Sequence, residues 1–220
     1  MQTTRVWDLP TRLFHWLLAA AVVGLAVTGQ IGGSWMEWHL RLGYSVFTLL
    51  LFRLVWGFVG GHWSRFASFF YSPATIWRYL RGQSAPEHNI GHNPLGFLSV
   101  LGLLGFTALQ VATGLFSDDE IATSGPFSKF ASSEWVGHAT DYHTKVGKFI
   151  LLGLVLLHIV AIIVYRIKKG QNLVAPMLHG DKQTEEGLPS ARDGIGTRLM
   201  ALLLLLGCAA GVTALLRWAA

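Results

Sequence analysis

Four histidines lie in or at the edges of strongly apolar segments of the sequence: His15, His39, His143 and His158. Neutral imidazole is the commonest metal ligand among protein side chains. An ionisable residue inside a membrane-spanning segment is costly to keep there, and by default it marks a functional site. Whether these four histidines act together depends on the segments that carry them.

The composition is that of a membrane protein. Of the 220 residues, 52% are hydrophobic and 13% are charged, about half the charged fraction of roughly 25% found in soluble domains. Because about 20 apolar residues span a bilayer, five segments predict transmembrane helices: 13–36, 39–60, 89–117, 149–165 and 199–216. The single cysteine, Cys208, excludes an internal disulfide, a Cys-ligated iron–sulfur cluster and covalent c-type haem.

The spans and the loops between them predict three parts. Residues 1–167 form a four-helix transmembrane core, residues 168–198 a solvent-exposed cytoplasmic linker, and residues 199–218 the fifth transmembrane helix. Asp8 with Pro10, and Asn93 with Pro94, are typical starts of helices. The inner-face loop 61–93 contains a short amphipathic stretch after Ser72-Pro73, typical of a helix on the membrane surface.

The distribution of Lys and Arg predicts the orientation. With the N-terminus in the cytoplasm, twelve basic residues lie on the inner side and five on the outer side, as the positive-inside rule requires. The C-terminus is then periplasmic. The outer loop 117–140 is acidic, which suits a basic partner such as a c-type cytochrome; an ordinary solvated loop is the alternative.

This topology sorts the histidines into two pairs by depth. His39 and His143 lie near the outer face, and His15 and His158 near the inner face. His143 and His158 are 15 residues apart, about 22 Å along a helix and on roughly the same side of it. Two histidines at one depth can ligate a haem b from both faces without a covalent link. We therefore predict two bis-His haems.

Four further residues are candidates for binding the cofactor. Gly43 and Gly147 each lie one turn after a candidate ligand, where a missing side chain leaves room for a porphyrin edge; small-residue helix packing is the alternative. Arg12 and Arg53 can pair with haem propionates, or can extend to the membrane surface.

Other histidines are weaker candidates. His138 competes with His143 for the outer site, but its position around the helix is less favourable and a place in the loop is expected. His92 is either a loop residue or part of an inner-face quinone or proton site. His62, His88 and His179 are expected to be solvated loop residues.

The sequence resembles the bacterial cytochrome b561 family, in the branch of the cytochrome b subunit of nickel–iron hydrogenases. The resemblance covers about residues 4–182 and rests on 6–8, 12–16, 91–96, the pair His143 and His158, and 172–180. It implies a four-helix core with two b-type haems held by His15, His39, His143 and His158. The family spacing between the last two ligands is 14, so the spacing of 15 here predicts a local bulge or a different ring angle.

Taken together, the sequence predicts an all-α integral membrane protein: a four-helix transmembrane bundle holding two haems, plus a fifth transmembrane helix. We expect a di-haem cytochrome b of the bacterial inner membrane, an electron-transfer protein or oxidoreductase subunit. Its expected partners are membrane lipid, quinone and an extracytoplasmic c-type cytochrome or hydrogenase, with no nucleic acid. A homodimer through the fifth helix stays open.

The sequence leaves two alternatives to this function. The first is a stand-alone quinol oxidoreductase that reduces superoxide or ferric iron, which differs only in what meets the outer haem. The second is a His-rich metal transporter or a passive anchor for a hydrogenase-like complex. The acidic residues avoid the membrane interior, which disfavours a transporter.

Overall fold

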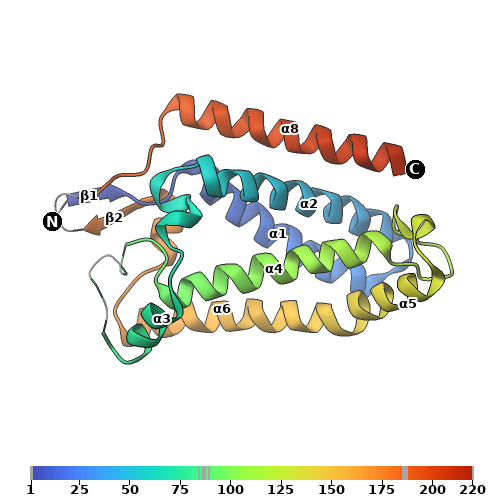
Figure 1. The fold of residues 1–220 in the computed structure, drawn as a ribbon, viewed down its shortest axis with the longest axis horizontal. Coiled ribbons are helices and arrows are strands. Elements are labelled where there is room, and N and C mark those ends of the chain that lie inside the picture. The colour runs from blue at the N-terminus through green and yellow to red at the C-terminus, as the bar shows by residue number, and fades with distance from the viewer. Residues whose placement is uncertain (1, 84, 86–87, 89, 185–187, 220) are drawn as a thin grey trace. The chain divides into compact units, whose positions relative to one another are not determined.

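The computed structural model describes residues 2–83, 85, 88, 90–184 and 188–219, and it is dominated by long helices (Figure 1). Among the residues described, five helical segments are long and apolar enough to cross a membrane, as predicted. They comprise α1 (Leu9–Ile31), α2 (Met36–Val59), α4 (Pro94–Phe116), α6 (Lys148–Lys168) and α8 (Ile195–Ala219). Outward side chains such as Phe58 (68% exposed) and Leu203 (69%) are apolar, as lipid contact requires.

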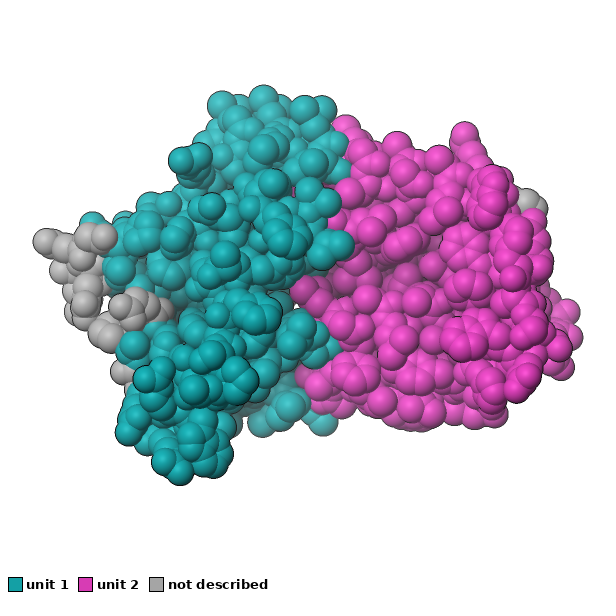
Figure 2. Space-filling model, in the orientation of Figure 1, with its two compact units in different colours: residues 1–15, 53–102, 156–204 teal, residues 16–52, 103–155, 205–220 magenta. Residues whose placement is uncertain are grey.

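Two compact units divide these helices (Figure 2). Unit 1 comprises residues 1–15, 53–102 and 156–204, and unit 2 comprises residues 16–52, 103–155 and 205–220. His15 and His158 belong to unit 1, whereas His39 and His143 belong to unit 2. Each predicted histidine pair therefore lies inside one unit.

The predicted helix starts are present. Asp8 accepts a hydrogen bond from the backbone N–H of Thr11 at 2.8 Å, and Asn93 accepts one from the N–H of Gly96 at 2.7 Å. The amphipathic stretch of the inner loop is helix α3 (Pro73–Leu80), which Ser72 caps. Short 3₁₀ turns connect the longer elements at Gly33–Trp35, His62–Ser64, Phe66–Ser68 and Ser128–Phe130.

The fourth span begins earlier in the chain than the apolar pattern indicates. Helix α5 (Ser133–Asp141), capped by Ser132, continues through a π-helix, η6 (Tyr142–Gly147), directly into α6. His138 accordingly lies in a helix and not in the expected loop. The π-helix is the bulge that the extra residue between His143 and His158 predicts, since a π turn takes up one more residue than an α turn.

Unit 1 also contains a two-stranded antiparallel sheet, which the sequence pattern does not predict. Strand β1 (Gln2–Arg5) pairs with β2 (Asp181–Thr184), which follows helix α7 (Val174–His179). Buried side chains from distant parts of the chain pack beside the sheet: Val6, Trp7, Trp63, Ile90 and Ala191, with Met177 and Leu188 against them. Part of the segment 168–198 is therefore structured and buried.

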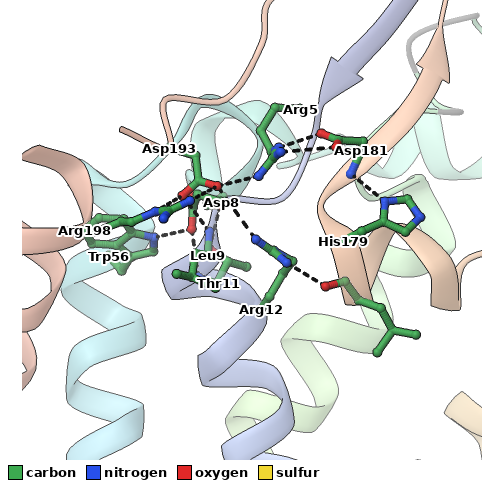
Figure 3. Close-up of polar contacts among 12 residues, drawn as sticks. Arg5, Asp8, Leu9, Thr11, Arg12, Trp56, His179, Asp181, Asp193 and Arg198 are labelled. Carbon is green, nitrogen blue, oxygen red and sulfur yellow. Dashed lines mark hydrogen bonds and ion pairs between the residues drawn. The ribbon is translucent and has the colours of Figure 1, made fainter. Parts of the chain in front are cut away.

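Asp8 organises the start of α1. Its buried carboxylate accepts a hydrogen bond from the indole N–H of Trp56 at 3.2 Å, besides that from Thr11 (Figure 3). It also accepts hydrogen bonds from the backbone N–H of Gly61 at 3.1 Å and from the hydroxyl of Ser64 at 2.7 Å. A carboxylate that accepts several hydrogen bonds is strongly held, and replacing it strands buried donors. The Asp of the opening motif therefore ties α1 to the end of α2.

Three arginines surround the carboxylate of Asp193, just before the start of α8. Its carboxylate lies 2.6 Å from Arg5, 3.2 Å from Arg198 and 3.8 Å from Arg12, and it accepts the backbone N–H of Leu9 (Figure 3). Its side chain is only 7% exposed. Within unit 1 the first turn of α8 is thus joined to the first turn of α1 through charge.

Candidate metal centres

The outer histidines, His39 and His143, face each other within unit 2. Their ring centres are 6.1 Å apart and the ring planes are nearly perpendicular, at 88°. The Nδ1–H of His143 donates to the carbonyl of Gln110 at 2.9 Å, and that of His39 to the carbonyl of Leu25 at 3.1 Å. Because a carbonyl can only accept, Nδ1 carries the proton in both rings and leaves Nε2 available as a ligand.

Glycines on the neighbouring helices make room for these two rings. A Cβ added to Gly29 would lie 2.9 Å from Cε1 of His39, and one added to Gly114 would lie 2.7 Å from Cε1 of His143. Each glycine comes four residues after the residue whose carbonyl accepts from the ring. Neither glycine is among the residues predicted from the sequence, because the four-residue spacing becomes meaningful only when the accepting carbonyls are known.

The inner histidines, His15 and His158, form a second pair within unit 1. Their ring centres are 6.4 Å apart with an angle of 51° between the planes. Nδ1 of His158 lies 3.3 Å from the hydroxyl of Ser99, so a polar group of another helix again contacts Nδ1 of a paired histidine.

Both separations fit one metal ion between two imidazoles. Two metal–nitrogen bonds of about 2 Å each, added to the distance from each nitrogen to its ring centre, account for such a spacing. Within the residues that the structure describes, no three His, Cys, Asp or Glu side chains gather as a metal site. Two protein ligands suit a haem iron, whose remaining ligands come from the porphyrin, and do not suit a structural zinc.

Arg53 is a buried cation whose position suits an anionic group. It is 4% exposed, its guanidinium lies 4.7 Å from the centre of the Phe66 ring, and its Nη1 has no hydrogen-bond partner among the described residues. A buried charge is costly unless it is paired. A haem propionate would supply the missing acceptor.

The other three predicted cofactor residues have different surroundings. Arg12 donates to the carbonyl of Leu178 at 2.6 Å and lies near Asp193. The space beside Gly43 is open, because an added Cβ would meet no atom within 4 Å. Beside Gly147, an added Cβ would collide with the Gln110 amide and the Tyr142 ring.

His92 lies between two aromatic rings in unit 1, with ring centres 4.7 Å from Trp7 and 4.5 Å from Phe69. Burial lowers the pKa of His92 to about 3, and the positive charge of Arg53 adds to this effect, so the ring is neutral at physiological pH. Its buried Nδ1 has no partner in the described chain. His138, by contrast, is 73% exposed on α5 and lies 3.9 Å from Glu134.

The long apolar helices and the two pairs of facing imidazoles that they carry are typical of multi-pass membrane proteins that bind a metal cofactor through histidines. Residues 6–180 match the family model of prokaryotic cytochrome b561, and the chain belongs to that family. It is therefore a membrane cytochrome of b type, which carries haem b and transfers electrons.

Several curated proteins are similar over most of the chain. A probable Ni/Fe-hydrogenase B-type cytochrome subunit of Bradyrhizobium diazoefficiens is 27% identical, covering 82% of this chain and 86% of that protein. Proteins of the same description from Cupriavidus necator (26% identical; 82% and 87% covered) and Escherichia coli K12 (hydrogenase 1; 24%; 86% and 94%) are also similar. No solved structure gives a significant match.

Proposed function

We propose that the chain binds two b-type haems, one between His39 and His143 and the other between His15 and His158. The observation that carries this proposal is the spacing of two imidazole pairs at 6.1 and 6.4 Å, together with Nδ1–H bonds that leave Nε2 for the metal in the outer pair. Arg53 offers its charge to a propionate of the inner haem, and the open space beside Gly43 admits an edge of the outer one.

The physiological role that we propose is electron transfer between the quinone pool and an extracytoplasmic redox protein. The haem iron supplies a reversible one-electron couple, and the protein supplies its ligands, orientation and charge environment. The relatives named as hydrogenase cytochrome subunits support a hydrogenase-like enzyme as the partner. The acidic outer segment 117–120, which contains Asp118, Asp119 and Glu120, supports a basic docking partner such as a c-type cytochrome.

The proposed location is the bacterial inner membrane, with the N-terminus in the cytoplasm and the C-terminus in the periplasm. The excess of basic residues on the side that holds the N-terminus supports this orientation. The inner haem site then lies toward the cytoplasm and the outer site toward the partner.

Haem content tests the proposal directly. A pyridine haemochromogen assay and reduced-minus-oxidised spectra of the purified protein should give two b-type haems per chain, falling to about one in His39→Ala and in His158→Ala. His138→Ala is the matched control and should keep both haems. A well-folded wild-type protein that lacks haem would overturn the assignment, and so would equal loss in the control.

A further inference from the structure

We infer that Gln110 is the positioning residue for His143, through two hydrogen bonds that run in opposite directions. The main-chain carbonyl of Gln110 accepts from Nδ1–H of His143 at 2.9 Å, and the side-chain Nε2 of Gln110 donates to the main-chain carbonyl of His143 at 2.7 Å. One residue of α4 thereby holds both the ring and the backbone of this histidine. The inference rests on the proposed outer haem site.

The π-helix places an irregular stretch of backbone at His143, where Gln110 makes its second contact. Within η6 (Tyr142–Gly147) the wider turn departs from the regular α-helical bonding pattern, and such an irregular stretch is where a side chain of a neighbouring helix can insert and bond to the backbone. His143 is the second residue of η6, and Gln110 donates to its carbonyl. The extra residue between His143 and His158 is thus taken up where a side chain of the neighbouring helix supports the backbone.

The space for the Gln110 amide comes from a glycine. Gly147 is buried, and an added Cβ would collide with Oε1 of Gln110 and with the Tyr142 ring. The direction of the amide is fixed because only its NH₂ group can donate to the His143 carbonyl. Gln110, His143 and Gly147 therefore form one interlocking set, for which we use the name Gln110 clamp.

The partner histidine is held differently. His39 is bonded through its ring, to the Leu25 carbonyl at 3.1 Å and to the Thr28 hydroxyl at 3.2 Å. If the Gln110 clamp sets the backbone of His143, it also sets the plane of that ring, and so the angle of 88° between the two outer rings. The inner pair, at 51°, provides an internal reference that lacks the clamp.

The angle between two imidazole planes is measurable in a bis-His haem, because it controls the anisotropy of the low-spin ferric electron paramagnetic resonance signal. The nearly perpendicular outer pair should give the more anisotropic of two signals. We expect Gln110→Met, which keeps the length of the side chain but removes the donor, to shift or abolish that signal and leave the inner signal unchanged. Thr113→Val is the matched control on the same helix, since among the described residues the Thr113 hydroxyl bonds only to carbonyls of its own helix.

The outcomes separate this inference from the proposed function. Wild-type protein without two low-spin signals contradicts the haem sites themselves. Two wild-type signals that both survive unchanged in Gln110→Met contradict the Gln110 clamp alone. If Gln110→Met loses both signals, the polar isostere Gln110→Glu is measured next. Loss of the outer signal alone in Gln110→Glu supports the inference. Any other pattern overturns it, because Gln110 would then support the whole bundle or neither histidine.

Discussion

At the scale of single residues, the positions of buried polar side chains indicate where the chain can bind a cofactor. Sequence spacing alone brought together His39 with His143 and His15 with His158, and the structure places both pairs ring to ring. The spacing gave no sign of Gly29, Gly114 or the Gln110 clamp. These residues lie on helices that do not carry the histidine they support, so their roles depend on helix packing and not on local pattern.

The charge of Arg53 leads to a prediction for the proposed inner haem. A positive charge near a haem stabilises the reduced iron, so Arg53→Gln should lower the midpoint potential of the inner haem. We expect a fall on the order of 60 mV, the equivalent of about 1.4 kcal/mol for one electron. A spectroscopic redox titration of both haems measures this shift.

Arg65→Gln supplies the comparison for that titration, since Arg65 is an exposed basic residue of the same unit, shortly after the end of α2. An unchanged potential in Arg53→Gln, or an equal fall in Arg65→Gln, would show that the buried guanidinium does not act on the haem.

At the scale of elements, capping and composition predicted the helices well, because Asp8, Ser72 and Asn93 each satisfy backbone N–H groups at a helix start. The β1–β2 sheet and the early start of the fourth span were not predictable in the same way. Four-residue strands carry little periodic signal, and the polar sequence of α5 hides a helix that continues an apolar one.

The Asp193 cluster gives a prediction for the start of α8. Burial alone would raise the pKa of Asp193, but hydrogen bonds from Arg198, the Leu9 N–H and Arg5 outweigh it and hold the pKa below its ordinary value. The cluster therefore stabilises the fold fully above the ordinary pKa of about 3.9, and loses this contribution as the pH falls through the lower folded-state value.

Asp193→Asn should remove that pH dependence and weaken the attachment of α8 by about 2 kcal/mol at neutral pH, the scale of hydrogen bonds to a charged group. Faster tryptic cleavage after the exposed Arg192 measures the loss. Asp119→Asn is the control, because Asp119 is an exposed acid whose pKa is lowered to about 2 by backbone N–H groups of its own loop. Equal cleavage rates in all three proteins would mean that the cluster does not restrain α8.

At the scale of the whole molecule, the proposed orientation is open to a labelling test that the composition makes simple. Cys208 is the single cysteine, so Cys208→Ser provides a background without thiols. In that background Ile121→Cys, at a position 92% exposed in the predicted outer loop 117–140, should react with an impermeant maleimide in intact cells. Thr3→Cys should react only after lysis. Labelling of Thr3→Cys in intact cells would show that the proposed orientation is wrong and that the N-terminus lies in the periplasm.

The ion pairs of Arg5 and Arg12 also have a consequence for the order in which the protein is made. Both arginines are synthesised with the first span, whereas their carboxylate partners, Asp181 and Asp193, follow more than 160 residues later. In the proposed orientation, the N-terminal end of α1 carries these positive charges without Asp181 and Asp193 while it enters the membrane, and the charges favour keeping that end on the cytoplasmic side. Once Asp181 and Asp193 have been made, the same arginines pair with them. In the proposed orientation, one pair of side chains would thus first direct insertion and then hold the ends of the finished chain together.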